Sequence, residues 1–532
     1  MFRDFERPGR SPVLARNAAV ATSHPLATSA ALEVLYEGGN AVDAAIAACA
    51  VQAVVEPHMN GIGGDCFAIV MEPDGRMTGF NGSGAAPAAA SPKRLADLGV
   101  VDQIPPVSPH SVTVPGAVRA WETILKAHGT RGLDALLTRA IDYAANGFPV
   151  APRVARDWAC NVGKLARLPA SAADYLIDGA APKAGTILKY PRLADSLAAI
   201  ASGGAEAFYS GPIAEDIVSA VRDLGGLLDL EDLGACHTSI VAPIMRGYRG
   251  HTIAELPPNG QGVIALVILG ILERFDLESL DPLGADRFHL QMEAARLAYA
   301  VRDRFVTDPA FMEIGAADLI SEATIDQLLP MITAGRRSKD FPVIGLAPQT
   351  DTVYLSVVDK DGLSVSLINS IFSEFGSGIV APKSGVLLHN RGSVFTARPG
   401  QAQSIAGGKY PLHTIIPAMG LKSGHPWLCF GVMGGHYQAC GHAHLLTNII
   451  DYGMDVQAAI DCPRMFFDLQ TGALDAEAAL PENTVEGLRQ YGHDVRAAAS
   501  PIGGSQAIRI DRSRKLLIAG SDPRKDGHAA GY

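Results

Sequence analysis

The sequence predicts a mixed α/β protein whose helices pack against a sheet, and three observations support this. Helical stretches alternate along the chain with short β-branched runs at 67–71 and 252–256. Residues 41–55 are apolar almost all round, which is typical of a helix that is buried on every side. The later part of the chain contains two strand-like runs, 352–358 and 363–368, joined by Asp-Lys-Asp-Gly, a sequence that favours a hairpin turn.

Helix boundaries are expected where glycine and capping residues stand. A first helix over 28–37 ends at the pair Gly38-Gly39, and Asn40 can cap the second helix. Further helices are expected over 116–128, 133–146, 212–224, 263–272 and 287–304. The segment 334–350 has neither helical nor strand period, so we expect an exposed linker there.

Composition excludes several classes of protein. With 44 Lys and Arg against 55 Asp and Glu, the 532 residues carry a formal charge of −11 and offer no basic footprint for nucleic acid. The longest apolar run, 263–272, is shorter than the roughly 20 residues that cross a bilayer. The N-terminus has no apolar segment of the signal-peptide kind, so we expect a cytoplasmic protein without membrane or nucleic-acid partners. Its seven cysteines include no Cys-x-x-Cys pair and indicate neither a disulfide framework nor a zinc site.

The usual catalytic and cofactor signatures are missing. There is no Gly-x-Ser-x-Gly, His-Glu-x-x-His, Gly-x-x-x-x-Gly-Lys-Ser/Thr or Gly-x-Gly-x-x-Gly sequence. The glycine-rich stretch 60–65 superficially resembles a phosphate loop, but it lacks the lysine and follows a helix. His442 and His444 would point apart on a helix, so we expect surface histidines rather than metal ligands. The sequence therefore predicts neither a cofactor nor a metal.

Several ordered segments together resemble the γ-glutamyltransferases. They include Glu-Gly-Gly-Asn-Ala-Val-Asp-Ala-Ala at 37–45, Asp-Thr-Val-Tyr-Leu-Ser-Val-Val-Asp at 351–359 and Met-Gly-Gly at 433–435. The other matching segments are 114–118, 225–226 with 231–233, 256–258, 375–378, and 521–524 with 531–532. The resemblance covers essentially the whole chain.

This resemblance implies an Ntn hydrolase, an α/β protein with a four-layer αββα sandwich that is made as an inactive precursor and cuts itself before a threonine. Thr352 is the matching position, so the cut is expected between Asp351 and Thr352. The large fragment 1–351 and the small fragment 352–532 would then form one globule. The sequence leaves open a dimer of these heterodimers.

A threonine at a new N-terminus can supply both nucleophile and base. Its free α-amine takes the proton from its own hydroxyl, so no distant histidine or metal is needed. The resemblance implies that Thr352 has this role, although a threonine before a strand is usually only a β-former. Taken by itself, Thr352 would carry no functional signal.

Two further motifs match family positions around the nucleophile. Gly434 and Gly435 match a pair whose backbone amides stabilise the oxyanion, and the alternative is a tight turn that needs glycine. Ser370 matches a hydroxyl residue beside the nucleophile and could bond the amine or hydroxyl of Thr352. Its alternative is an ordinary strand or turn residue.

The expected substrate pocket departs from the family pattern. The family arginine that holds the glutamyl α-carboxylate falls on Ser83, and the aspartate for the α-amine falls on Val394. The adjoining Glu or Gln falls on Arg391. The pocket thereby loses both partners of an amino acid and gains a cation. The alternative for Arg391 is a surface or structural ion pair.

Three more positions change in the same pocket. The family Ser-Ser pair falls on His413 and Thr414, the substrate-side asparagine on Phe372, and the residue two after the nucleophile, commonly histidine, on Tyr354. Little remains to hold an ammonium group, whereas a cation with His413 could hold a carboxylate. We therefore list the substrate-binding candidates as Arg391, His413, Thr414, Tyr354 and Ser83.

The resulting hypothesis is an N-terminal-threonine amidohydrolase that cleaves the amide of a small acid without an α-amino group. It resembles the oxamate amidohydrolase branch of the family and, more distantly, cephalosporin (glutaryl) acylases. The alternatives are a γ-glutamyltransferase or glutathione hydrolase with altered contacts, and a catalytically silent binding relative. The partners expected are a small-molecule amide substrate and the two fragments of one precursor.

Overall fold

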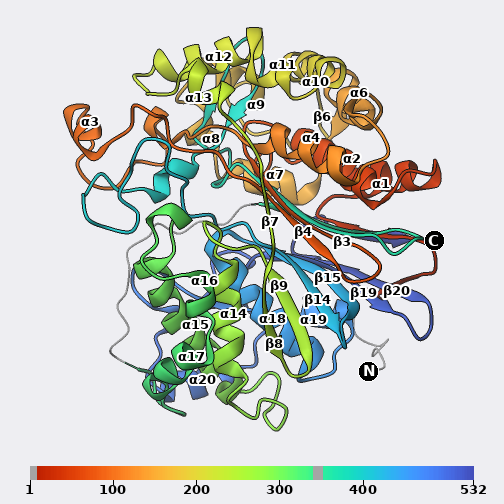
Figure 1. Ribbon diagram of the computed structural model, residues 1–532, viewed down its shortest axis with the longest axis vertical. Coiled ribbons are helices and arrows are strands. Elements are labelled where there is room, and N and C mark those ends of the chain that lie inside the picture. Colours follow the sequence, from red (N-terminus) through yellow and green to blue (C-terminus); the bar gives the residue numbers. More distant parts are fainter. Residues whose placement is uncertain (1–8, 339–351) are drawn as a thin grey trace.

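The computed structural model describes residues 9–338 and 352–532, which fold around two seven-stranded sheets packed face to face (Figure 1). The first sheet has the order β1 (Val13–Ala15), β20 (Leu516–Ser521), β19 (Gly504–Asp511), β15 (His425–Met433), β14 (Pro417–Lys422), β9 (His251–Glu255) and β8 (Ile244–Tyr248). The second has the order β21 (His528–Gly531), β2 (Ala19–Thr22), β10 (Val353–Val358), β11 (Ser364–Ser370), β3 (Asp65–Met71), β4 (Met77–Gly82) and β7 (Ser239–Val241). Strands from both described ranges lie side by side in both sheets.

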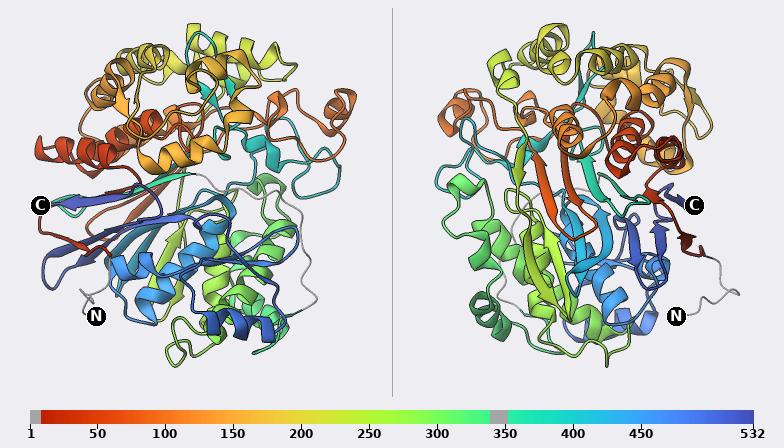
Figure 2. Two further views of the ribbon diagram at one scale, coloured as in Figure 1. Left: turned by 180° about the vertical axis from the view of Figure 1, so that it is seen from behind. Right: turned by 45° about the vertical axis from the view of Figure 1, so that its right-hand side comes forward.

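Helices cover the outer face of each sheet, which gives four layers in the order αββα. The principal helices next to the second sheet are α1 (Pro25–Tyr36), α2 (Ala41–Val55) and α4 (Ala117–His128), with α10 (Pro191–Gly203) and α12 (Gly211–Arg222) beyond them. Those on the first sheet are α14 (Gly262–Leu272), α15 (Ala285–Phe305), α18 (Gln438–Ile450) and α19 (Val456–Asp461). Apolar side chains of both inner faces, among them Phe67, Tyr354 and Met419, pack between the sheets. Figure 2 shows the same layering from two other sides.

The buried helix predicted over 41–55 is confirmed with the same bounds. Asn40 accepts hydrogen bonds from the amides of Val42 and Asp43, both at 3.0 Å, and the Asp43 carboxylate accepts one from the Asn40 amide at 3.0 Å. This reciprocal cap explains why α2 begins at Ala41. Every residue of the helix is buried.

The predicted hairpin is also confirmed. β10 and β11 pair antiparallel, from Val353 opposite Asn369 to Val358 opposite Ser364. This register brings Thr352, the residue before β10, to the end of β11. The hairpin lies in the middle of the second sheet, with β2 on one side and β3 on the other.

Two sequence expectations need correction. The helix expected over 133–146 is divided into α5 (Leu133–Leu136) and α6 (Thr138–Asn146), and the Thr138 hydroxyl donates to the Ala135 carbonyl at 2.9 Å in place of continued helical bonding. His442 and His444 are buried in α18 instead of lying on the surface. Their neighbours explain this, since His442 pairs with buried Glu255 at 2.6 Å.

Two further expectations concern the linker and membrane spans. Of the expected linker, 334–338 is described, and the Arg337 amide donates to the Tyr491 carbonyl at 2.8 Å. Residues 339–350 lie outside the described residues. Among the helices described, none is both long enough and apolar enough to span a bilayer.

Candidate active site

Thr352, the expected nucleophile, is fully buried at the start of β10, where two side chains contact its hydroxyl. The Thr352 Oγ1 atom donates to Ser370 Oγ at 3.2 Å and accepts from Gln438 Nε2 at 3.3 Å. Ser370 Oγ also accepts from the Phe372 amide at 2.9 Å. The hairpin register places Ser370 here, so the structure brings these two predicted residues together.

Gly434 and Gly435 form a turn between β15 and α18. Their φ angles are +120° and +55°, and a Cβ on Gly434 would lie 2.8 Å from the Cα atom of Gly503. Side chains are thus excluded by the backbone angle and, at Gly434, also by the close approach. Gly434 is the N-cap and Gly435 the first residue of a short 3₁₀ helix, Gly435–Tyr437, that continues into α18.

The start of a helix is suited to holding an oxyanion. Its first amides have no intrahelical acceptor, and the aligned peptide dipoles make this end positive. Gln438 is the first residue of α18, and its side-chain Nε2 atom donates to the Thr352 hydroxyl at 3.3 Å. Gln438 therefore links Thr352 to the segment that begins with the Gly-Gly turn.

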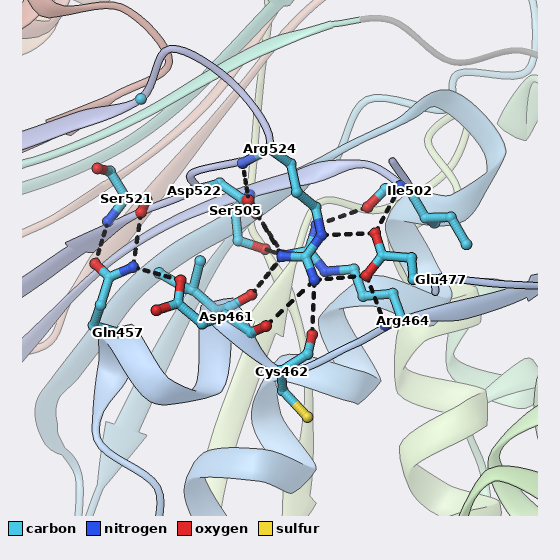
Figure 3. Close-up of polar contacts among 12 residues, drawn as sticks. Gln457, Asp461, Cys462, Arg464, Glu477, Ile502, Ser505, Ser521, Asp522 and Arg524 are labelled. Carbon is cyan, nitrogen blue, oxygen red and sulfur yellow. Dashed lines mark hydrogen bonds and ion pairs between the residues drawn. The ribbon is translucent and has the colours of Figure 1, made fainter. Parts of the chain in front are cut away.

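A network of buried and partly buried charged side chains contacts Ile502, as Figure 3 shows. We name Arg464, Glu477, Asp522 and Arg524 the C-terminal cluster. Arg464 donates to the Ile502 carbonyl at 2.8 Å, and Glu477 accepts from the Ile502 amide at 3.0 Å. Because Gly503 follows directly and contacts Gly434, this network supports the turn from behind.

A second set of buried charges lies beside the nucleophile. We name Asp65, His389, Arg391 and His413 the site cluster; all four side chains are completely buried. Asp65 Oδ2 lies 2.9 Å from His389 Nδ1, 3.5 Å from His413 Nε2 and 3.7 Å from Arg391 Nε. The other carboxylate oxygen, Oδ1, accepts from the Gly84 amide at 3.2 Å.

Arg391 connects this cluster to the nucleophile. Its Nη1 atom donates to Thr414 Oγ1 at 3.0 Å, and its guanidinium carbon lies 3.9 Å from the ring centre of Phe372. Phe372 has a φ of +79°, a strained backbone for a residue with a side chain, and its amide donates to Ser370. Arg391, Phe372, Ser370 and Thr352 are thus successive neighbours.

Several nitrogen atoms of the site cluster have no hydrogen-bond partner, although two of them lie 3.5 and 3.7 Å from Asp65. Within residues 9–338 and 352–532, neither Nε nor Nη2 of Arg391 makes a hydrogen bond, and neither ring nitrogen of His413 makes one. Buried polar groups are normally satisfied, and unsatisfied ones call for a specific explanation such as a ligand. These donors are suited to an anionic group.

Burial controls the protonation of this cluster. It lowers the pKa of Arg391 to about 9 although Asp65 opposes the shift, so the guanidinium remains charged at neutral pH. Burial together with Arg391 places the pKa of His413 well below its usual value, so that ring is neutral. Burial raises the pKa of Asp65, but His389, His413 and Arg391 outweigh it, and the net shift is downward.

The other predicted residues take different places. Ser83 is buried and accepts from Asn259 Nδ2 at 3.1 Å, next to the glycine that bonds Asp65. Tyr354 lies between the sheets and its hydroxyl bonds Ser356 and Ser366, both at 2.8 Å, so the structure does not bring it into the site cluster. Asp351 lies outside the described residues.

The sequence prediction missed three residues of the site. Asp65 belongs to the stretch 60–65, for which the sequence suggested only a phosphate loop; a carboxylate at the start of a buried strand was the available signal. His389 and Gln438 carried no signal, because their roles depend on contacts across the fold. No group of three or more His, Cys, Asp or Glu within the described residues is placed to hold a metal ion.

An αββα sandwich with a threonine directly before a central strand is the arrangement of an N-terminal nucleophile hydrolase. The family model of gamma-glutamyltranspeptidase matches residues 27–532, and the chain belongs to this family. The family's Ntn-type chemistry, hydrolysis of C–N bonds, agrees with the sequence prediction.

Individual relatives cover nearly the whole chain. The glutathione hydrolase-like YwrD proenzyme of Bacillus subtilis (strain 168) is 35% identical over 525 residues, 96% of this chain and 98% of its own. The oxamate amidohydrolase proenzyme of Klebsiella pneumoniae is 35% identical over 522 residues, 96% of this chain and 97% of its own. The crystal structure of cephalosporin acylase from Bacillus halodurans superposes with a TM-score of 0.92 at 36% identity, covering 100% of this chain and 99% of that one.

Proposed function

We propose that this protein is a self-processing amidohydrolase that cleaves the amide of a small, oxamate-like acid without an α-amino group. The observation that carries the proposal is the set of Arg391 and His413 nitrogens without a hydrogen bond, in a cluster that Phe372 and Ser370 connect to Thr352. The name of the oxamate amidohydrolase relative supports the substrate class.

In this proposal Thr352 becomes the N-terminus after the chain is cut between Asp351 and Thr352. Its α-amine then takes the hydroxyl proton while Oγ1 attacks the amide carbon to give a tetrahedral oxyanion. The oxyanion collapses, the C–N bond breaks, and the leaving amine takes the proton back from the α-ammonium, which leaves the acyl group as an ester on Oγ1. Water, deprotonated by the same α-amine, then hydrolyses this ester, which releases the acid and restores the hydroxyl. The amides of Gly434 and Gly435 receive the oxyanion. Ser370 and Gln438 hold the hydroxyl before attack, since both contact it. The proenzyme names of relatives support the cut.

The two fragments, 1–351 and 352–532, would stay together after processing. β10 and β11 lie between β2 and β3 in one sheet, so each fragment completes the hydrogen bonding of the other. Whether two such heterodimers associate into a dimer is a separate question for measurement.

The charges of the pocket argue against an amino-acid substrate. Asp65 is the carboxylate of the site cluster, and both of its oxygens have donors, from Gly84 and His389. An incoming ammonium would also meet the Arg391 guanidinium beside it, a repulsion that is strong in a buried site. An α-carboxylate next to the scissile carbonyl instead finds the free donors of Arg391 and His413.

The second candidate is hydrolysis of glutathione or another γ-glutamyl amide, favoured by the glutathione hydrolase names of other relatives, and the acylase names favour an acylase substrate, for which a glutaryl amide is the probe. One panel decides between them: processed protein is incubated with oxamate, a glutaryl amide, glutathione and a γ-glutamyl anilide, and released amine is measured. The proposal expects oxamate to have the highest kcat/KM. A large preference for glutathione would overturn it, and no turnover with an uncut chain on a denaturing gel would indicate a binding relative.

A further inference from the structure

The two shortest contacts of the His389 ring are with groups that only accept hydrogen bonds when Asp65 is ionised, whereas the Thr113 hydroxyl lies farther from Nε2, at 3.3 Å. Its Nδ1 atom is 2.9 Å from Asp65 Oδ2, and its Nε2 atom is 2.8 Å from the Thr113 carbonyl oxygen. A neutral imidazole has one donor and one acceptor nitrogen, so it can satisfy only one of these contacts. Both contacts are made if each nitrogen carries a proton.

The surrounding backbone fixes His389 in this place. Its amide donates to the Gly63 carbonyl at 3.0 Å, and a Cβ on Gly63 would lie 2.2 Å from the Leu387 carbonyl oxygen. The loop before β3 and the segment after Leu388 are therefore in close backbone contact. Asp65 and His389 meet because these two segments, more than 300 residues apart in sequence, pack together.

We propose that Asp65 and His389 are positioning residues that form a neutral buried ion pair, so that the charge of Arg391 is left for one carboxylate of the substrate. The inference rests on the proposed function and deepens it, since it assigns the substrate a single negative charge next to the scissile carbonyl. The site cluster then carries −1 on Asp65, +1 on His389 and +1 on Arg391, with His413 neutral. The net charge of +1 matches a monoanion and opposes a group that is zwitterionic at this position.

His389 is required for this charge balance because Arg391 also lies close to Asp65. Arg391 Nε is only 3.7 Å from Asp65 Oδ2, slightly farther than a hydrogen bond. If His389 no longer neutralises Asp65, the carboxylate competes with the substrate for Arg391. The anion would then enter a cluster of zero net charge, and its binding would lose the charge-assisted contact.

The test compares His389→Gln with the double variant Asp65→Asn/His389→Gln. The single variant has zero net charge in the cluster, so the KM for oxamate should rise by about ten- to a hundredfold with kcat changed far less. The double variant regains a net charge of +1, and its KM should return to within a few-fold of the wild-type value. A purely structural role would not give this rescue, because the double variant removes more native contacts.

Two controls separate charge from folding. His444→Gln changes another buried histidine, one that contacts Gln291 and Arg287 in the other half of the molecule, and should leave the KM unchanged. A neutral amide such as acetamide should be hydrolysed equally poorly by the wild type and by His389→Gln. Cleavage into two fragments on a denaturing gel reports that each variant has folded.

The outcomes of these experiments distinguish failure of the inference from failure of the proposed function. Turnover of oxamate by the wild type with an unchanged KM in His389→Gln overturns this inference while the proposed function stands. No turnover of oxamate or other amine-free amides by the wild type overturns the proposed function itself. If His389→Gln does not fold, the double variant decides: a KM near the wild-type value supports the inference, and a tenfold increase contradicts it.

Discussion

The two clusters of buried charge differ in how completely their polar atoms are satisfied. In the C-terminal cluster, Arg524 donates to both oxygens of Glu477, at 2.7 and 2.6 Å, and Asp522 accepts from Arg464 at 2.5 Å. No buried side-chain nitrogen or oxygen of that cluster lacks a partner within the described residues. In the site cluster, two nitrogens of Arg391 and both of His413 have none.

The pKa shifts show the same difference. Burial lowers the pKa of Arg524, but Asp522 and Glu477 raise it, and the net shift is upward. For Arg391, burial prevails over Asp65 and the pKa falls to about 9. A satisfied ion network stabilises the fold, whereas a cation whose charge is only partly compensated is available to bind a ligand. This contrast distinguishes a structural network from a candidate binding site.

The largest effect is expected from the nucleophile beside the site cluster. Thr352→Ala removes the hydroxyl needed for both self-cleavage and hydrolysis, so the chain should stay intact and inactive. A denaturing gel and an oxamate assay measure this. Because the C-terminal cluster is untouched, the unfolding temperature should remain close to that of uncut wild-type protein. Fragments appearing at the wild-type rate would rule out the assignment.

The second-largest effect is expected on the stability of the fold. Arg464→Met leaves the Asp522 carboxylate, which is completely buried, with one cation fewer, and breaking a buried pair costs about 3–5 kcal/mol of unfolding free energy. Chemical denaturation of the processed protein measures this. Arg496→Ala, which removes an exposed ion pair with Asp494 at 2.6 Å, is the control and should leave the unfolding free energy almost unchanged, because water and salt screen such a pair. An equal loss of unfolding free energy in the two variants would contradict a structural role for the C-terminal cluster.

Arg391→Gln should mainly reduce activity, whereas Arg464→Met should mainly reduce stability. Loss of a charge-assisted contact of about 1.5–3 kcal/mol lowers kcat/KM for oxamate by about ten- to a hundredfold. Stability should fall less than in Arg464→Met, because Arg391 makes one hydrogen bond, to Thr414, and its 3.7 Å contact with Asp65 is longer than a hydrogen bond. Processing at Thr352 should continue, since that step involves no substrate. An unfolded variant, or unchanged kinetics, would place Arg391 with the structural charges.

A smaller shift tests whether the pocket can be returned to the family pattern. Ser83→Arg with Val394→Asp restores partners for an α-carboxylate and an α-amine, so the preference for γ-glutamyl compounds over oxamate should rise by about tenfold. Val394 is buried, so the new carboxylate also needs its ammonium partner to be tolerated. The ratio of the two kcat/KM values is the measurement, and each single variant is a control. An unchanged ratio would argue that these positions do not select the substrate.

No effect is expected from removing metal. An amine base on the nucleophile and amide donors at the oxyanion give a metal ion no role in the proposed reaction. The oxamate hydrolysis rate of processed protein should be the same before and after exhaustive treatment with a chelator. A loss that added zinc restores would require a different mechanism.

The local features were available from the sequence because they depend on neighbours in the chain. The cap at Asn40 and the register of the hairpin follow from turn and capping chemistry over a few residues. The resemblance to γ-glutamyltransferases then indicated Thr352, Ser370 and the Gly-Gly pair, and the structure brings the first two into contact. The αββα layers also follow from that resemblance and are found in the structure.

The sequence by itself thus determined the α/β class, the family and the position of the threonine, since short-range pattern and ordered motifs carry that information. Only the tertiary structure decided which charges meet. Asp65 and His389 are more than 300 residues apart, and Arg391 could equally have been a surface residue until its burial was known. Burial and long-range packing set the partners and protonation of such groups, and neither property can be derived from local sequence.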